Sequence, residues 1–258
     1  MITAGIDVGL EFTKIVILDD DKIIAKGIEN TGGCGRVNTI EKLWNDTLGS
    51  AGITPSDVTK VVSTGKGKLD VSFYDYDVVE AVADASLAHF LDPSATTVVD
   101  LGANQTRVVA LGEGEEIDGI VLNQKCMGGL GMLMNTMSDR LGMTLEEFSS
   151  LPASEDTIVN DGCPVFAELD ALELLNNGVS KEKVGAAVID TVVVRLNSIL
   201  RDRVEPADKT KTVLIGGLTK NTAVVKGLME RSGIDFIIPE DAEYGGALGA
   251  AVIAKTIG

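Results

Sequence analysis

Two cysteines occupy positions where a thiolate could bind a metal or a cluster. Cys126 lies in the glycine-rich segment 123–131, and an apolar run of helical period follows over residues 132–141. Cys163 also comes directly before a helical pattern. The N-terminus of a helix favours negative charge, and glycines let backbone N–H groups point at a ligand. The sequence therefore predicts that both positions stabilise a thiolate or a cluster sulfide.

Other interpretations of the cysteines stay open at this point. Both thiols could be buried and chemically inert, which is the usual state of cysteine. A zinc ion shared between two chains would also fit, although the sequence has no Cys-x-x-Cys pair. Cys34, in a glycine-rich loop, has no assigned partner. Three cysteines are too few for a disulfide framework and their odd count favours a reducing compartment, so we expect a cytoplasmic protein.

A second set of residues could bind a nucleotide and its magnesium ion. Asp7 stands at the end of a predicted strand, and a glycine turn and a second strand follow it. The same order recurs at Asp100, and residues 99–111 align without gaps on residues 6–18, which indicates an internal duplication. An aspartate at a strand end can hold Mg²⁺, and the amides of a glycine turn can meet phosphate. We therefore expect Asp7 and Asp100 to face each other across a cleft.

The elements that must position these residues alternate between strands and helices. Strands are predicted within residues 2–18 and at 22–29, 60–64, 212–215 and 235–239, and helices at 38–48, 132–141, 181–203 and 221–231. Gly216 and Gly217 end one strand and offer a third close backbone approach, suited to an adenosine or an α-phosphate. Residues 244–253 form a small-residue helix that could pack tightly on a sheet. We expect an α/β fold of two lobes, residues 1–95 and 96–258, with a cleft between them.

The composition of the chain limits the kinds of molecule that it can bind. The 258 residues include 22 basic and 39 acidic ones, for a net charge of -17, which would repel nucleic acid and anionic membranes. Any nucleotide must then be held by backbone amides, glycines and a metal ion rather than by a basic patch. No apolar run approaches the roughly 20 residues that a membrane span needs, so we expect no membrane association.

The order of a strand, an Asp-x-Gly hairpin, its repeat and a strand-Gly-Gly-helix unit resembles the actin-like (RNase H-like) ATPase superfamily. The cysteine segments 123–131 and 162–168 are similar to those of the ATP-dependent activators of 2-hydroxyacyl-CoA dehydratases and benzoyl-CoA reductases. This resemblance covers essentially the whole chain. It implies ATP or ADP with Mg²⁺, a dimer, and one [4Fe–4S] cluster at the dimer interface, to which each subunit gives two cysteines, here Cys126 and Cys163.

The resemblance also implies a function. ATP hydrolysis would drive a low-potential electron, received from a donor such as ferredoxin or flavodoxin, into a cluster-containing dehydratase or reductase. Asp7 and Asp100 would be catalytic. The residues expected at the nucleotide are Gly9, Leu10, Glu11, Thr13, Lys14, Gly102, Ala103, Asn104, Gln105, Gly128, Gly129, Gly216, Gly217 and Asn221.

The sequence departs from this family at both turns. Leu10 and Glu11 stand where small hydroxylated residues are usual, and Ala103 and Asn104 change the second turn. A Gly-Ala turn with a basic residue four positions after the alanine, here Ala103 and Arg107, is more similar to the smaller ATPase subunit of benzoyl-CoA reductases. The dimer could therefore be a homodimer or a heterodimer with a paralogous ATPase subunit. A cluster-free actin-like small-molecule kinase and an actin-like scaffold are the alternative functions, and the cysteine contexts favour the activator over both.

Overall fold

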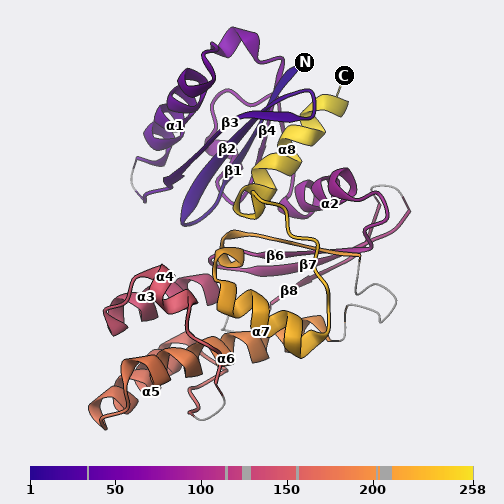
Figure 1. The fold of residues 1–258 in the computed structure, drawn as a ribbon. Coiled ribbons are helices and arrows are strands. Elements are labelled where there is room, and N and C mark those ends of the chain that lie inside the picture. Colours follow the sequence, from indigo (N-terminus) through magenta and orange to yellow (C-terminus); the bar gives the residue numbers. More distant parts are fainter. Residues whose placement is uncertain are drawn as a thin grey trace.

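The computed structural model describes residues 1–33, 35–113, 116–123, 129–154, 157–201, 203 and 211–257. Within them the chain forms two β-sheets with helices around them (Figure 1). The first sheet has the order β3-β2-β1-β4-β5, and the second has the order β8-β7-β6-β9. The strands are β1 (Ile2–Val8), β2 (Phe12–Asp19), β3 (Lys22–Asn30), β4 (Lys60–Thr64), β5 (Tyr76–Asp77), β6 (Thr97–Leu101), β7 (Thr106–Leu111), β8 (Ile117–Leu122) and β9 (Thr212–Ile215).

The helices fall into two groups. Helices α1 (Arg36–Ala51) and α8 (Gly245–Thr256) lie beside the first sheet, and α2 (Glu80–Leu91) packs against α8 and the second sheet. Those beside the second sheet are α3 (Leu130–Leu141), α4 (Leu145–Ser149), α5 (Pro164–Asn176), α6 (Lys181–Leu200) and α7 (Thr222–Ser232). Figure 1 shows this division, with α2 close to the boundary between the two sheets.

The two sheets are built on the same plan. In the first, β1 and β2 form an antiparallel hairpin, β3 continues it, and β4 runs parallel to β1. In the second, β6, β7, β8 and β9 repeat this arrangement. The register repeats as well, because Asp7 lies opposite Lys14 and Asp100 lies opposite Arg107. The predicted α/β architecture and its internal duplication are therefore confirmed.

Helix α8 comes last in the chain but packs on the first sheet, against β1, β4 and α2 (Figure 1). Two glycines allow this close approach. A Cβ atom on Gly5 of β1 would lie 1.9 Å from the carbonyl oxygen of Ala247, and one on Gly249 would lie 1.9 Å from that of Ala83 in α2. The predicted small-residue helix is confirmed in its place and packing. The boundary between residues 95 and 96 stays a prediction.

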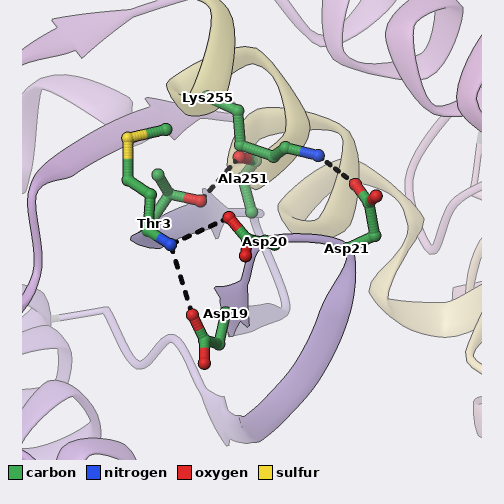
Figure 2. A network of polar contacts seen from close by, with 7 residues as sticks. Thr3, Asp19, Asp20, Asp21, Ala251 and Lys255 are labelled. Carbon is green, nitrogen blue, oxygen red and sulfur yellow. Dashed lines mark hydrogen bonds and ion pairs between the residues drawn. The ribbon is translucent and has the colours of Figure 1, made fainter.

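Polar contacts hold the far end of α8 (Figure 2). The β2–β3 turn carries three aspartates at residues 19–21, and the amino group of Met1 lies 3.3 and 2.8 Å from oxygens of the first two. Lys255 of α8 pairs with the third. The hydroxyl of Thr3 donates to the carbonyl oxygen of Ala251 at 3.1 Å. The ion pairs are exposed and add little stability.

Helix α6 lies in the core of the second half. Its buried side chains include Val188, Val192 and Leu196, which belong to the same apolar cluster as Met137 of α3 and Leu228 of α7. Burial of a helix on several sides requires apolar residues around most of its circumference. Among the described helices, none is both long enough and apolar enough to cross a membrane.

The predicted elements match the structure except at a few places. The predicted helix at 38–48 is α1, which extends to residues 36–51, and the one at 181–203 ends at Leu200. The strand predicted at 235–239 is wrong, because Ile237 forms only an isolated bridge with Val213. Two helices, α2 and α4, have no counterpart among the predicted elements.

The packing of α8 generates a test with a matched control. Gly249→Ala should lower the free energy of unfolding by about 1–3 kcal/mol, because the added methyl would meet the backbone of α2. A methyl group added at Gly49 of α1 would have no neighbouring atom within 4 Å, so Gly49→Ala should raise stability by up to about 1 kcal/mol. Urea unfolding of both variants measures the difference. Equal stability of the two variants would contradict the close contact.

Candidate functional site

A pocket opens between the two sheets, where the hairpin turns of both halves meet. The turns of residues 9–12 and 102–105 form two of its walls. Residues 216–217, after β9, and Gly246, at the start of α8, contribute to the others. The full lining is Asp7, Gly9, Leu10, Glu11, Phe12, Lys14, Thr64, Gly65, Lys66, Glu80, Asp100, Gly102, Ala103, Asn104, Gln105, Arg107, Gly216, Gly217, Glu243 and Gly246.

The two turns have the same geometry. The N–H of Gly9 donates to the carbonyl oxygen of Phe12 at 3.0 Å, and the N–H of Gly102 donates to that of Gln105 at 3.1 Å. A Cβ atom on either glycine would lie 2.8 Å from the same carbonyl oxygen. Both turns are therefore too tight for a side chain at their first glycine.

A left-handed glycine follows the parallel strand of each half. Gly65, after β4, has φ +90°, and Gly216, after β9, has φ +100°. A Cβ on Gly65 would lie 2.6 Å from Oδ1 of Asp7, and one on Gly216 would lie 2.5 Å from Oδ1 of Asp100. Only glycine adopts this conformation without strain. Each strand-end aspartate is thus packed against the backbone of its neighbouring strand's turn.

The first aspartate faces a lysine across its hairpin. Oδ2 of Asp7 lies 3.6 Å from Nζ of Lys14, and both side chains are 16% exposed. A Cβ on Gly246 would lie 3.1 Å from the same oxygen of Asp7, so the start of α8 closes one side of this carboxylate. Asp7 therefore lines the pocket, and the ammonium group of Lys14 lies beside it at a distance longer than a hydrogen bond.

The second aspartate belongs to a tighter set of charges. Nη2 of Arg107 donates to Oδ2 of Asp100 at 2.7 Å, and Nε of Arg107 donates to Oδ2 of Asp84 in α2 at 2.6 Å. Asp84 and Arg107 are almost completely buried. Oδ1 of Asp84 is buried and has no hydrogen-bond partner among the described residues. One guanidinium group thus joins a helix of the first half to the hairpin of the second.

Burial controls the titration of these groups. It raises the pKa of Asp84 to about 7, although Arg107 opposes the shift. Burial likewise raises the pKa of Asp100 against the effect of Arg107. Burial also acts to lower the pKa of Arg107, but the carboxylates of Asp84 and Asp100 outweigh it and the pKa lies above its ordinary value. Arg107 therefore stays charged, while both carboxylates are easier to protonate than exposed ones.

Glu11 links the first turn to helix α3. Its Oε1 accepts a hydrogen bond from Nδ2 of Asn135 at 2.9 Å, and its Oε2 is buried without a hydrogen-bond partner among the described residues. The second turn also contacts α3, because the N–H of Met132 donates to the carbonyl oxygen of Ala103 at 3.1 Å. Helix α3 is thus hydrogen-bonded to both turns.

The pocket is acidic overall. Its lining carries five carboxylate residues, Asp7, Glu11, Glu80, Asp100 and Glu243, against three basic residues, Lys14, Lys66 and Arg107. Glu80 is itself paired with Lys66 at 3.0 Å. An anionic ligand would be repelled by this charge unless a cation accompanies it.

Most of the predicted site residues line this one pocket. They are Asp7, Gly9, Leu10, Glu11, Lys14, Asp100, Gly102, Ala103, Asn104, Gln105, Gly216 and Gly217. Three others lie outside its lining. Thr13 is buried and its hydroxyl hydrogen-bonds that of Thr31, Asn221 caps α7 by accepting from the N–H of Val224, and Gly129 is the N-cap of α3. Their predicted contacts with a nucleotide stay predictions.

Five charged residues in or behind the pocket were absent from the predicted set. Lys66 follows β4, Arg107 lies in β7 and Glu243 precedes α8. Glu80 of α2 also lines the pocket, and Asp84 lies behind the lining, four residues further along the same helix. The detectable signal was a pair of acidic residues at helical spacing in an otherwise alanine-rich segment. Such a pair places both carboxylates on one face of a helix.

The structure describes one of the two predicted cluster ligands. Cys163 is the half-buried N-cap of α5, and its N–H donates to Oδ1 of Asn160 at 2.9 Å. Cys126 and Gly128 lie outside the described residues, as does Cys34. Within the part of the chain that is described, no three His, Cys, Asp or Glu side chains are grouped to hold a metal ion. The thiolate site stays a prediction, with Cys163 at a helix N-terminus as expected.

The shifted pKa of Asp84 gives a pH prediction. Between its ordinary value of 3.8 and about 7, the folded protein keeps a proton that the unfolded chain loses, so this group lowers stability as pH rises through that window. The charges acting on it are Arg107, Asp100 and Asp7. Asp84→Asn removes the titration. The Tm of this variant minus that of the wild type should therefore increase with pH.

The control is Asp190→Asn. Asp190 lies outside the pocket lining, and its Oδ1 is 2.7 Å from Nη2 of Arg231. Thermal unfolding of both variants across the window measures the effect. A Tm difference for Asp84→Asn that is as independent of pH as that of the control would contradict the raised pKa.

Comparison with known proteins agrees with this geometry. A family model described as the BadF/BadG/BcrA/BcrD ATPase family matches residues 4–254. The activator of lactoyl-CoA dehydratase from Anaerotignum propionicum is 31% identical, over 98% of this chain and 97% of its own length.

Two solved structures are similar over nearly the whole chain. The activator of the 2-hydroxyisocaproyl-CoA dehydratase from Clostridium difficile, with bound ADPNP, has a TM-score of 0.88 and 26% identity, covering 98% of this chain and 94% of that one. Component A of the Acidaminococcus fermentans (R)-2-hydroxyglutaryl-CoA dehydratase has a TM-score of 0.89 and 26% identity, with coverages of 99% and 98%. The predicted actin-like fold and the resemblance to the activators are confirmed, and the chain belongs to the BadF/BadG/BcrA/BcrD ATPase family.

Proposed function

We propose that this protein hydrolyses ATP to drive an electron into a 2-hydroxyacyl-CoA dehydratase or a related reductase. The observation that carries the proposal is the pair of equivalent Asp-x-Gly hairpins, which meet in one pocket of a chain from an ATPase family. The sequence similarity to a protein named as a dehydratase activator supports a dehydratase or a related reductase as the partner that accepts the electron. The proposed electron donor is a small redox protein of the ferredoxin or flavodoxin kind.

The pocket suits a nucleotide with its magnesium ion. The two tight turns line the pocket, and the backbone amides of such turns can approach phosphate oxygens. Gly216 and Gly217 offer the same close approach for the α-phosphate or adenosine. The solved relative with bound ADPNP supports nucleotide binding by this chain.

The donor set of the pocket fits Mg²⁺. This ion usually takes one or two protein carboxylates and completes its octahedron with water and phosphate oxygens. Asp7 and Asp100 supply such carboxylates from the two halves of the chain. When bound, the ion would neutralise phosphate charge in an acidic pocket. Lys14 would contribute a mobile positive charge near Asp7.

Two thiolates per chain fit half of an iron–sulfur cluster. A cubane needs four thiolate ligands, so Cys126 and Cys163 of one chain require two more from a second chain. A [4Fe–4S] cluster supplies a one-electron carrier when it is bound. The position of Cys163 at the N-terminus of α5 favours an anionic ligand. The second chain would be a copy of this one or a paralogous ATPase subunit.

The described surface next to Cys163 supports an interface there. Helix α5 buries only Ala167 and Ala171, while Val165, Phe166 and Leu169 are each more than half exposed. Exposed apolar side chains gathered at one place mark surfaces that associate with other proteins. The proposed dimer would cover this face of α5 and bring the cysteines of two chains together.

Hydrogen bonds through α3 connect the two proposed sites. Cys126 precedes α3 by four residues in the sequence, and α3 is hydrogen-bonded to Glu11 of the first turn through Asn135 and to Ala103 of the second turn through Met132. A change in either turn on nucleotide binding would therefore be transmitted to the helix next to the cysteine. Local ligand contacts act on distant sites through such elements.

Replacement of Asp7 tests the nucleotide site. Asp7→Asn should slow ATP turnover by about 100-fold, because it removes a charge placed to hold Mg²⁺ at the transferred phosphate. The control is Asp46→Asn, an exposed aspartate paired with Lys42 on α1, which should keep wild-type turnover. Steady-state phosphate release measures both variants. Wild-type turnover in Asp7→Asn would refute the assignment of this carboxylate.

Iron content tests the cluster site. Protein purified without oxygen should contain about two iron atoms per chain, because one cubane of four irons is shared by two chains. Cys163→Ser should reduce iron to near zero, whereas Cys34→Ser should leave it unchanged. Iron and acid-labile sulfide are measured together with the mass in solution. Full iron loading in Cys163→Ser would exclude this cysteine as a ligand.

A further inference from the structure

The charge set around Arg107 contains one residue to which the proposed function gives no part. Asp84 lies on α2, in the first half of the chain, and is completely buried. Its Oδ2 accepts from Nε of Arg107 at 2.6 Å, and the same guanidinium reaches Asp100 through Nη2 at 2.7 Å. We propose that Asp84 is a positioning residue for ATP hydrolysis, which acts through Arg107 to set the orientation and availability of the Asp100 carboxylate.

The geometry fixes the guanidinium plane. Arginine presents its N–H groups in a rigid planar fork, so two carboxylates that bind different nitrogens of the fork also fix its orientation. Asp84 binds Nε and Asp100 binds Nη2. With Nε held in the core, the guanidinium contacts Asp100 from one side. The other side of Asp100 faces the pocket, where the side chain is 20% exposed.

Charge sharing supports the same conclusion. A guanidinium bound to a single carboxylate would take most of that carboxylate's capacity to bind a cation or accept a proton. The second carboxylate, from Asp84, neutralises part of the Arg107 charge at a point outside the pocket lining. Arg107 then holds Asp100 in place, and the Asp100 carboxylate keeps part of its capacity to bind a cation or accept a proton.

The first hairpin lacks this arrangement in its described contacts. Lys14 takes the position of Arg107, but it lies 3.6 Å from Asp7 and no second carboxylate pairs with it among the described residues. The two halves are otherwise alike in strand pairing, turn bonds and left-handed glycine. The difference is therefore specific to the wall that carries Asp100.

Stability alone does not account for Asp84. A buried ion pair is often no more stabilising than apolar residues of the same size. Asp84 also leaves Oδ1 buried without a hydrogen-bond partner among the described residues, which costs free energy. An alanine-rich helix such as α2 could pack there without any charge. A role in holding Arg107 explains why a carboxylate is present at this position.

The test compares five proteins in steady-state ATP hydrolysis with Mg²⁺. They are the wild type, Asp84→Asn, Arg107→Lys, the double variant of these two, and the control Asp190→Asn, which removes the carboxylate of the Asp190–Arg231 pair outside the pocket. Loss of a supporting contact behind a site typically lowers activity about 10- to 100-fold. Asp84→Asn should therefore lower kcat about 10-fold or more while KM for MgATP stays within about twofold.

Arg107→Lys should lower kcat similarly, because a lysine ammonium cannot bind both carboxylates in a fixed plane. The double variant should be no slower than the slower single variant, since both changes break one unit. The control should keep kcat and KM. Thermal unfolding checks that each variant is folded, and if Asp84→Asn is not, Arg107→Lys carries the test alone.

This inference rests on the proposed ATP hydrolysis, and the outcomes separate the two. A wild type that hydrolyses ATP together with a folded Asp84→Asn of unchanged kcat would overturn the role of Asp84 and leave the proposed function intact. A rise in KM at constant kcat would also overturn it, because the residue would then act on binding alone. A wild type without ATP turnover would overturn both.

Discussion

The backbone contact between α2 and α8 is the constraint on which the cleft depends. Gly249 lets α8 cross α2 against the carbonyl of Ala83, and Gly5 lets the same helix lie on the first sheet. Because α8 is fixed in this way, its first residues close one side of Asp7. Because α2 is fixed beside it, the acidic face of α2 reaches the hairpin of the second half. A larger side chain at either glycine would separate the elements that carry the two walls.

The pocket combines a repeated backbone with side chains that are not repeated. Both hairpins have the same register, the same bond across the turn and the same left-handed glycine beyond the neighbouring strand. The repeated parts are those that place a carboxylate at a strand end. The side chains around each carboxylate differ, with a loosely placed lysine on one wall and a doubly bound arginine on the other. The two aspartates therefore occupy equivalent positions in unequal electrostatic surroundings.

The sequence predicted the features that depend on local patterns. The Asp-x-Gly hairpins and the Gly-Gly turn were identified because a tight turn needs glycine at fixed offsets from the strand. Helix α2 was missed for a physical reason. Most of its residues are buried on all sides, its N-cap Val79 offers no side-chain hydrogen bond, and so neither an amphipathic period nor a capping signal marks it. Asp84 and Glu80 were missed along with the helix.

Other predictions depended on contacts between distant segments. The apolar residues around Phe236 and Ile237 have strand-like composition, but only Ile237 pairs with β9, because the chain passes the edge of the sheet rather than extending it. The bond between Glu11 and Asn135 joins residues 124 positions apart. Neither contact leaves a local pattern, since a pairing of this kind is set by the folded topology and not by neighbouring residues.

The excess of carboxylates in the pocket has a consequence for how its ligands depend on each other. With the proposed ligands, a nucleotide alone would meet repulsion there, and a divalent cation alone would lack the phosphate oxygens that complete its coordination shell. Each ligand would therefore improve the site for the other, and thermodynamic reciprocity would make the two enhancements equal in size. The protein would discriminate between magnesium-bound and metal-free nucleotide without any residue that contacts the base. The free magnesium concentration would then set the effective affinity for nucleotide.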